Sequence, residues 1–320
     1  MAFANALGDA KLSIIVIRRL LIVAMETQTD NNNAKRAQTS RSKKQTRRQV
    51  IRTTLAATAL VGLYTWRVEP HWIEIVRRTL PIAGIPSKLH GSTLVQLSDL
   101  HIGPQVDDDY LLHAMGLVGE LNPDIVVYTG DFVSYHSDLN GNVAGMIPKL
   151  AHGRLGTIGV LGNHDYGPGF QDHSFADRVV AMASDAGIAI LRNELASIEG
   201  LNIIGVDEVW VNRCRPQNVL PSLATDQPAL VLLHNPDGAD LPLWEPFRGW
   251  ILSGHTHGGQ CKPPFLPPPI VPVRNRRYTS GEIALGNGRH MYINRGLGHL
   301  LRVRFNARPE ITVFTLVSKA

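Results

Sequence analysis

The stretch STLVQLSD, residues 92–99, is a short apolar run that ends in a carboxylate. Four later stretches have the same form, namely DIVVYTGD (124–131), GTIGVLGNHD (156–165), PALVLLHNPD (228–237) and GWILSGHTH (249–257). Each is mostly apolar and partly β-branched, and each ends in Asp, Asn or His. Runs of this kind are typical of strands that are buried on both faces. The five stretches therefore predict the buried strands of an α/β protein.

Helices are predicted between some of these runs. Residues 108–121 and 174–186 have helical patterns, and Gly187 is a typical C-terminal cap for the second. The acidic residues 107–109 predict the N-terminal cap and first turn of the earlier helix.

The later part of the chain predicts further strands without long helices between them. The candidate strands are LNIIGVDEVW, MYINRGLG and ITVFTLV, and Ile73–Ile82 is a candidate first strand. The Pro-rich residues 261–278 predict a long surface loop without regular structure. We therefore expect an α/β fold with two sheets and helices outside them.

Composition and charge limit the class of protein. The formal net charge of the 320 residues is +5, but residues 1–67 carry 12 Lys/Arg against 3 Asp/Glu. The remaining 253 residues carry 20 against 24, a net charge of −4. Because a protein that binds nucleic acid through a basic face keeps that charge on its folded part, no nucleic acid is expected as a partner. Cys214 and Cys261 are too few for a disulfide framework, and the sequence leaves open whether they pair.

The N-terminal region predicts two segments ahead of the main domain. Residues 1–45 form a basic, polar extension that we expect to be disordered, and the main domain spans residues 68–320. Residues 46–67 begin with TRRQVIRTTLAATALVGLYTW, in which two arginines precede a mildly apolar run, the order found in twin-arginine export signals. The alternative is a short buried helix behind a solvated basic segment. If translation starts at Met25, the N-terminal leader, meaning the export signal and the residues before it, has a length that is ordinary for such signals.

This leader decides the expected location of the protein. Its apolar run, residues 53–66, is shorter than the roughly 20 residues that cross a bilayer as a helix. We expect the twin-arginine export machinery as a partner, and a protein that is membrane-associated, periplasmic or in the cell envelope. The alternative is the cytoplasmic face of the membrane. The only A-x-A triplet lies inside the apolar run, so the sequence leaves open whether the leader is cleaved or stays as an anchor.

Polar residues gather at the ends of the five predicted strands, where open α/β folds bind their ligands. The candidate metal ligands are Asp99, His101, Asp131, Asn163, His234, His255 and His257. Residues i and i+2 of an extended segment point the same way, so Asp99 with His101, and His255 with His257, can each aim two side chains at one place. Glycines beside these residues let the backbone and a metal approach closely.

In order and spacing these residues resemble the calcineurin-like metallophosphoesterases, whose signature reads D-x-H, G-D, G-N-H-[DE], H and G-H-x-H. All five blocks are present between Asp99 and His257. With its leader, the chain looks most similar to the bacterial branch that carries a twin-arginine signal. The resemblance implies a four-layer α-β-β-α sandwich with two mixed β-sheets and a metal site at the C-terminal ends of the strands.

The resemblance also implies a role for each residue. One metal ion would be held by Asp99, His101, Asp131 and His257. The second would be held by Asp131, Asn163, His234 and His255, so that Asp131 bridges the two. His164 would be catalytic, standing near the leaving group, with its imidazole oriented by Asp99 or Asp165. Two divalent ions are expected, and mixed nitrogen and oxygen ligation suits Mn, Fe, Zn or Co without selecting one.

The chemistry of such a site points to phosphate esters. Two ions about 3.5–4 Å apart can lower the pKa of a shared water and clamp phosphoryl oxygens during in-line displacement. The expected reaction is hydrolysis of phosphate esters, phosphodiesters first, by attack of a metal-bridging hydroxide, with a small molecule or lipid as substrate. The alternative within the superfamily is a phosphomonoesterase or a lipid-linked pyrophosphate hydrolase.

Two other classes of function are less favoured. A catalytically inactive metal-binding envelope protein would show a degraded ligand set, and no ligand is missing here. A zinc hydrolase of the β-lactamase type would require an H-x-H-x-D-H run, which the chain lacks.

Overall fold

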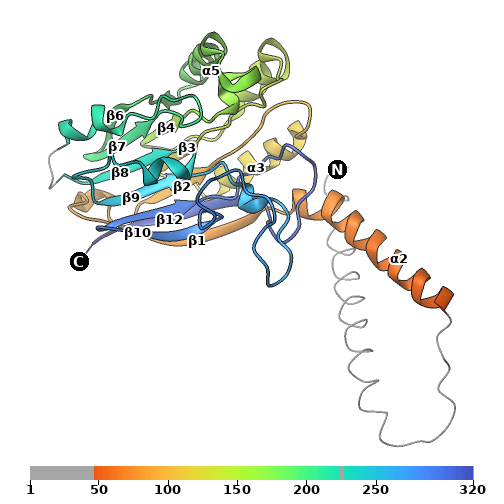
Figure 1. Ribbon diagram of the computed structural model, residues 1–320. Coiled ribbons are helices and arrows are strands. Elements are labelled where there is room, and N and C mark those ends of the chain that lie inside the picture. The colour runs from red at the N-terminus through yellow and green to blue at the C-terminus, as the bar shows by residue number, and fades with distance from the viewer. Residues whose placement is uncertain (1–46, 224–226, 320) are drawn as a thin grey trace, which may run out of the picture. The chain divides into compact units, whose positions relative to one another are not determined.

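The computed structural model describes residues 47–223 and 227–319 (Figure 1). The chain divides into two compact units, Met1–Ala57 and Thr58–Ala320. The predicted extension over residues 1–45 and the alternative start at Met25 lie outside the described residues.

The predicted leader segment is helical where the structure describes it. Helix α2 spans Arg47–Leu63 and is followed by the short turns η2 (Tyr64–Val68) and η3 (Glu69–His71). Within the described part of the chain, no helix combines the length and the apolar content that crossing a membrane requires. Export through the twin-arginine route stays a prediction.

The first sheet has the order β1-β12-β2-β3-β4-β5. All neighbouring strands in it run parallel except β12 and β2, which are antiparallel, so the sheet is mixed. Its strands are β1 (Glu74–Ile82), β2 (Thr93–Leu97), β3 (Ile125–Thr129), β4 (Gly156–Val160), β5 (Ala189–Ile190) and β12 (Glu310–Ser318).

The second sheet has the order β10-β11-β9-β8-β7-β6. Its four central strands are parallel, and the edge strands β10 and β6 are antiparallel to their neighbours, so this sheet is mixed as well. Its strands are β6 (Glu194–Ile198), β7 (Leu201–Val206), β8 (Ala229–Leu233), β9 (Gly249–Ser253), β10 (Gly281–Gly286) and β11 (Arg289–Ile293).

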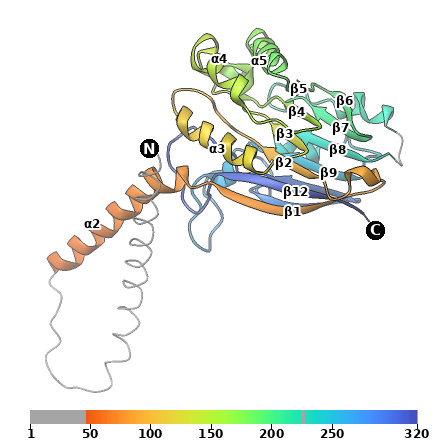
Figure 2. The same cartoon turned by 180° about the vertical axis from the view of Figure 1, so that it is seen from behind.

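Three apolar cores hold these layers together. One lies between the sheets, and the residues that form it include Leu94, Val127 and Leu232. A second lies on the outer face of the first sheet, which α3 (Asp108–Glu120), α4 (Ala144–Met146) and α5 (His173–Asp185) cover (Figure 2). The third core packs Trp244 and Phe247 against the outer face of the second sheet.

The layer over the second sheet differs from the layer over the first. It contains loops and the turns η9 (Pro216–Asn218), η10 (Leu220–Ser222) and η11 (Pro236–Asp240), because the chain there is too rich in Pro and Gly for a long helix. The remaining short turns are η4 (Ser87–Leu89), η5 (Leu139–Val143), η6 (Ile147–Lys149), η7 (His164–Tyr166), η8 (Pro168–Phe170) and η12 (His257–Gly259).

The predicted α/β fold with two mixed sheets and helices around them is confirmed. All five stretches that end in polar residues contain a strand, and Ile73–Ile82 contains β1. The Asp107 carboxylate caps α3 by accepting from the amide of Asp109, as predicted. Residues 261–278 form the predicted loop. The sequence interpretation missed β5, β6 and β10, because β5 has only two residues and β6 and β10 are partly exposed edge strands.

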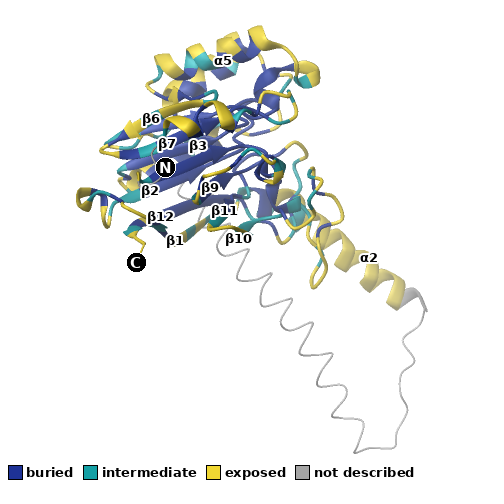
Figure 3. Cartoon of the chain, turned by 60° about the vertical axis from the view of Figure 1, so that its left-hand side comes forward, coloured by how far each residue is buried: buried dark blue, intermediate teal, exposed yellow. Residues whose placement is uncertain are grey.

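The fold brings the ends of strands from both sheets to one place. The buried amide of Gln96, on β2, donates to Thr129 Oγ1 in the first sheet and to the carbonyl of Ser253 in the second. The amide of Gly254 donates to the carbonyl of His234, so the ends of β8 and β9 are joined as well. In Figure 3 the central strands around this place are dark blue, the colour of buried residues.

Candidate metal centre

All eight predicted site residues lie together at the carboxyl ends of β2, β3, β4, β8 and β9. They are Asp99, His101, Asp131, Asn163, His164, His234, His255 and His257, and all are buried. Three groups of their ligand atoms are close enough to hold an ion, since the atoms within each group lie within 4.8 Å of one another.

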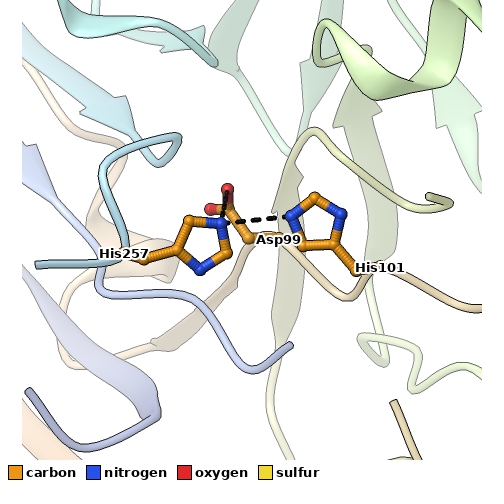
Figure 4. A group of neighbouring side chains, drawn as sticks. All are labelled: Asp99, His101 and His257. Atoms are coloured by element: carbon orange, nitrogen blue, oxygen red, sulfur yellow. Dashed lines mark hydrogen bonds and ion pairs between the residues drawn. The ribbon is translucent and has the colours of Figure 1, made fainter. Parts of the chain in front are cut away.

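The first group joins the end of β2 to the turn after β9. Figure 4 shows Asp99, His101 and His257 pointing toward one another. His257 Nε2 lies 3.3 Å from Asp99 Oδ1 and 3.1 Å from His101 Nε2. Two imidazole nitrogens and a carboxylate oxygen therefore meet in a buried space.

The second group lies around Asp131. His234 Nε2 is 3.3 Å from Asp131 Oδ2, and His255 Nδ1 is 3.2 Å from His234 Nε2. The same Asp131 oxygen lies 3.6 Å from His101 Nε2, which belongs to the first group. Asp131 therefore lies between the two groups and is within reach of both. A third, overlapping group consists of His101, Asp131 and His164.

Carbonyl acceptors orient two of the histidines toward the cluster. His234 Nδ1 lies 2.6 Å from the carbonyl oxygen of Thr129, and His255 Nε2 lies 2.9 Å from that of Pro272. A carbonyl oxygen only accepts, so each of these ring nitrogens carries the proton. When both rings are neutral, the opposite nitrogens present lone pairs beside Asp131, and a cation can bind there.

Asn163 has the features expected of a metal ligand. Both of its side-chain polar atoms are buried and without a hydrogen-bond partner among the described residues. It lines the same cavity as Asp131 and His255. Because an unpaired buried amide costs free energy, its position fits coordination of an ion from the open side of the cluster.

The electrostatics of the cluster favour positive charge there. Burial alone would raise the pKa of Asp131, but His234 and the other imidazoles hold it well below its usual value. Burial lowers the pKa of His101 and His257, which leaves their rings neutral and able to coordinate. Burial raises the pKa of Asp99 to about 6. The residues present thus fit a metal centre by charge, by unpaired atoms and by donor type.

The backbone at these residues is not extended, contrary to the sequence interpretation. Asp99 and His101 have φ values of 52° and 50°, and His255 and His257 have 72° and 50°. Each is therefore in the left-handed region rather than in a strand. The ends of β2 and β9 turn sharply, and it is this turn that directs the side chains inward; His255 joins the Asp131 group while His257 joins the Asp99 group.

His164 lies beside the cluster with its main chain fixed. Its amide donates to Asp131 Oδ1 at 2.8 Å, and its ring packs edge-on against His101 and at an angle against Tyr135. Neither carboxylate expected to orient the imidazole contacts it. The Asp165 carboxylate instead accepts from the amides of Gly162 and Val133, while Asp99 faces His257.

A cavity of about 540 Å³ opens onto the cluster. At its inner end lie Asp131, Asn163, His164, His255 and His257. Its walls are mainly aromatic and aliphatic, and include Tyr135, Phe170, Trp210, Ile270, Leu300 and Leu301. The sequence interpretation missed the three aromatic residues, since they lie in loops where no periodicity marks them. Trp210 packs edge-on against the His255 ring at a centroid distance of 4.7 Å.

Two further polar residues near the strand ends, Arg295 and His299, have structural roles. Arg295 forms ion pairs with Glu310 and Glu74, and His299 contacts the carbonyl of Gln105. Both cysteines are free: Cys214 is buried, and Cys261 is half-buried in the wall of the cavity.

Comparison with known proteins agrees with this geometry. The family model for calcineurin-like phosphoesterases matches residues 92–259, which contain all eight site residues. The chain is 32% identical to phosphodiesterase YaeI of Escherichia coli (strain K12) over 273 residues, which cover 84% of this chain and 97% of that one. It is 33% identical to the uncharacterized metallophosphoesterase YkuE of Bacillus subtilis (strain 168), with 86% and 99% covered.

A third relative is named as a pyrophosphatase. The chain is 26% identical over 313 residues to the UDP-2,3-diacylglucosamine pyrophosphatase LpxG of Chlamydia trachomatis serovar D, with 82% and 94% of the two chains covered. The matched segment, the level of identity and the buried cluster of histidines and carboxylates all point to the same assignment. The chain belongs to the calcineurin-like phosphoesterase family and is a metal-dependent phosphoester hydrolase.

Proposed function

We propose that this enzyme is a binuclear metal-dependent phosphodiesterase. The observation that carries the proposal is the position of Asp131, whose Oδ2 is 3.3 Å from His234 Nε2 and 3.6 Å from His101 Nε2. A carboxylate that reaches two groups of ligands is the residue that a site for two ions requires.

The two groups divide the ligands between two ions. Asp99, His101, Asp131 and His257 would hold the first, and Asp131, Asn163, His234 and His255 the second. Bound there, two divalent ions supply Lewis acidity and a net positive charge, because only two of the seven ligands are anionic. The donor set admits Mn, Fe, Zn or Co.

His164 is the proposed catalytic residue. Its side chain lies in the cavity wall next to the cluster, and the bond from its amide to Asp131 Oδ1 fixes its main chain there. Its ring packs against Tyr135 and Phe170, which limits rotation. An imidazole held at this place can give a proton to the oxygen that departs from phosphorus.

The cavity supports a diester as the substrate. Among the described residues that line it, none is Lys or Arg. A dianionic monoester would benefit from an additional cation, whereas a diester carries one negative charge and has two substituents. The aromatic and aliphatic walls can accommodate those substituents.

A lipid-linked pyrophosphate is the second candidate substrate. The outer half of the cavity, with Ile270, Leu300 and Leu301, is apolar enough to hold the first part of an acyl chain. The relative named as a UDP-2,3-diacylglucosamine pyrophosphatase supports this candidate.

We also propose that residues 46–67 direct export by the twin-arginine route and that residues 68–320 form the catalytic domain. The Arg47–Arg48 pair ahead of a mildly apolar helical segment supports this. Replacing both arginines with lysine should leave the protein in the cytoplasm in a fractionation experiment. An unchanged distribution between cytoplasm and envelope would refute the export route.

The catalytic proposal is tested by Asp131→Asn. The variant should hydrolyse bis-p-nitrophenyl phosphate in the presence of Mn²⁺ more than about 100-fold more slowly than the wild type, because both ions lose a ligand. Its circular dichroism spectrum should not change. Asp185→Asn, at an exposed position at the end of α5, removes the same charge and should keep full activity. Full activity of Asp131→Asn would refute the bridging role.

A further inference from the structure

The mouth of the catalytic cavity is surrounded by exposed apolar side chains. Phe265, Leu266, Ile270, Leu300 and Leu301 are exposed, with Phe265 fully so and Ile270 and Leu301 at 77% and 70%. We call these five residues the apolar rim. Ile270, Leu300 and Leu301 line the cavity that leads to Asp131 and His257, so this part of the rim lies at the opening to the metal centre.

Two segments far apart in the sequence form the rim as one surface. The first is the loop between β9 and β10, which projects away from the sheets (Figure 1). The second lies between β11 and β12. The amide of Lys262 donates to the carbonyl of Phe305 at 2.7 Å, and Gln260 Nε2 donates to the carbonyls of Leu301 and Val303. The two segments are therefore fixed side by side.

The first segment of the rim is rich in proline. The sequence KPPFLPPPIVP, residues 262–272, contains six prolines, which restrict the backbone of the loop. Val271 is buried, whereas Phe265, Leu266 and Ile270 stay exposed. Arg276 donates to the carbonyls of Pro268 and Pro269 and fixes the base of the loop. Since proline has no N–H, this loop also brings few unpaired donors into an apolar surrounding.

Charge is distributed unequally within the folded unit. Residues 246–309, which contain the whole rim, carry ten Lys/Arg and a single acidic residue, Glu282. Residues 68–245 carry nine Lys/Arg against 22 Asp/Glu. The segment that contains the rim, residues 246–309, is therefore strongly basic, whereas residues 68–245 are acidic.

Several of these cations flank the rim without a counter-ion. Lys262, Arg274, Arg276 and Arg277 are exposed, and within the described part of the chain none of them forms an ion pair. Lys262 lies next to Pro263, and the other three follow the rim loop directly. Exposed apolar side chains flanked by unpaired cations match the surface of an anionic lipid bilayer, which has an apolar interior and anionic headgroups.

Two exposed tryptophans each pack against an arginine, and the arginine beside Trp72 lies near the rim. Trp66 packs against Arg67, and Trp72 packs against Arg308, with guanidinium-to-ring distances of 4.1 and 4.0 Å. Arg308 and Phe265 line one further cavity. Tryptophan beside a cation is typical of residues at the boundary between lipid and water.

We propose that the apolar rim docks on an anionic lipid bilayer. Phe265, Leu266, Ile270 and Leu301 enter the boundary between headgroups and acyl chains, and the flanking cations contact the anionic headgroups. The mouth of the cavity then faces the lipid. A nucleic acid is a poorer match, because Leu and Ile side chains offer no surface on which bases stack. The docking does not depend on hydrolysis, so its test is independent of the proposed catalytic function.

The first test measures binding of the full chain to vesicles by co-sedimentation at low salt. The wild type should bind vesicles of phosphatidylcholine and phosphatidylglycerol in equal amounts at least about tenfold more tightly than vesicles of phosphatidylcholine alone. Lys262→Gln with Arg274→Gln should remove most of this preference. The matched control, Lys149→Gln with Arg213→Gln, removes two exposed cations from the acidic part of the sequence and should retain it.

The second test locates the contact itself. Leu266→Cys is labelled with nitrobenzoxadiazole in a Cys261→Ser background; Cys214 is buried and does not react. The control is Leu195→Cys, which replaces a partly exposed leucine on the edge strand β6. Emission from the label at position 266 should shift to the blue and rise about twofold or more on the mixed vesicles, and emission from position 195 should not change.

Either of two results would overturn the proposal. One is an unchanged emission at position 266 while the protein sediments with the vesicles, since binding would then belong to another part of the chain. The other is equal binding to neutral and anionic vesicles. Normal hydrolysis of a soluble aryl diester by the labelled variant would show that the catalytic site is intact in either case.

Discussion

At the scale of single residues, the site depends on a backbone conformation that most residues avoid. Five of the seven proposed ligands, namely Asp99, His101, Asp131, His255 and His257, have positive φ values between 50° and 72°. Asp and His enter this region more readily than most residue types, but each such residue still costs about 1–3 kcal/mol. The surrounding hydrogen bonds hold them in place, such as those from the amide of His255 to both oxygens of Asp99.

Two glycines beside the ligands, Gly162 and Gly254, are required because a Cβ does not fit at either position. A Cβ at position 162 would overlap Asp131 Oδ1 and the amide of residue 131, and one at position 254 would overlap Ser98 Oγ and Asp99 Oδ2. Neither glycine has a positive φ, so the close approach of the ligand carboxylates is the reason for them.

Gly162→Ala should therefore displace Asp131 and lower kcat/KM for an aryl diester by about 100-fold. Gly116→Ala in α3 is the matched control, because nothing lies within 4 Å of a Cβ there. This control should keep full activity and gain about 0.5–1 kcal/mol of stability. Steady-state kinetics and urea unfolding measure both, and equal activity of the two variants would contradict the steric role.

Arg304 is a fully buried cation that the sequence interpretation did not single out. Its guanidinium donates to the carbonyls of Arg295, Gly296, Gly298 and Ala307. A Cβ at position 296 would overlap Asp99, and one at 298 would overlap the carbonyl of Leu100. Arg304 thus holds residues 295–298 against the backbone that carries Asp99.

Arg304→Met should lower the free energy of unfolding by about 3 kcal/mol or more, because it leaves several buried carbonyls without a donor. Arg154→Met breaks an exposed ion pair with Asp124 and should cost less than about 1 kcal/mol. Urea unfolding followed by circular dichroism compares the two. Equal losses would mean that the carbonyls near Arg304 find other donors.

At the scale of elements, strand ends position the site and helix α3 supports it. Tyr110, in the first turn of α3, donates from its hydroxyl to the carbonyl of Leu297, in the segment that Arg304 holds. The N-terminus of α3 is in turn fixed by Asp107, whose carboxylate accepts from the amide of Asp109 at 3.1 Å. The cap therefore helps to align the helix with the loop beside Asp99.

Asp107→Ala should lower the free energy of unfolding by about 1 kcal/mol through loss of the cap, and Asp107→Asn should lose only a small part of that. The comparison is informative because Asp107 also lies 3.8 Å from Arg302, an interaction that Asn cannot replace. Thermal or urea unfolding of the three proteins gives the answer. Equal losses in both variants would assign the stabilisation to the ion pair with Arg302.

At the scale of the whole molecule, the two sheets meet around a buried cluster whose charges and polar atoms are not fully paired by other side chains. Burial lowers the pKa of His234, but the Asp131 carboxylate overrides this and raises it well above its usual value, so that without a metal a proton on His234 takes the place of the cation beside Asp131. Among the residues that the structure describes, Asn163 has no hydrogen-bond partner for either side-chain polar atom. A bound cation satisfies all these groups together, so binding of metal and stability of the two-sheet unit should be linked.

Addition of Mn²⁺ to chelator-treated protein should therefore raise Tm by about 5–10 °C at a metal concentration about 100-fold above Kd. Asp131→Asn should lose most of this shift, and Asp185→Asn should keep it. Differential scanning calorimetry makes the measurement without any substrate. A Tm that does not respond to the metal in the wild type would contradict a resident metal centre.

The sequence by itself determined the five buried strands and the residues that follow them. These features depend on neighbours only a few positions apart: an apolar, β-branched run predicts a strand, and Asp, Asn or His at its end predicts a polar edge. The resemblance to the calcineurin-like family rests on the same short blocks, and the family match over residues 92–259 confirmed it.

Only the tertiary structure decided how these residues meet. The left-handed turns at Asp99 and His257, the carbonyl partners of His234 and His255, and the buried position of Arg304 depend on segments far apart in the chain. The bond from the amide of His255 to Asp99 joins residues 156 positions apart. Local periodicity does not encode such contacts, because packing of the two sheets creates them. The same holds for the apolar rim, whose two halves become one surface only when β9 and β11 lie side by side.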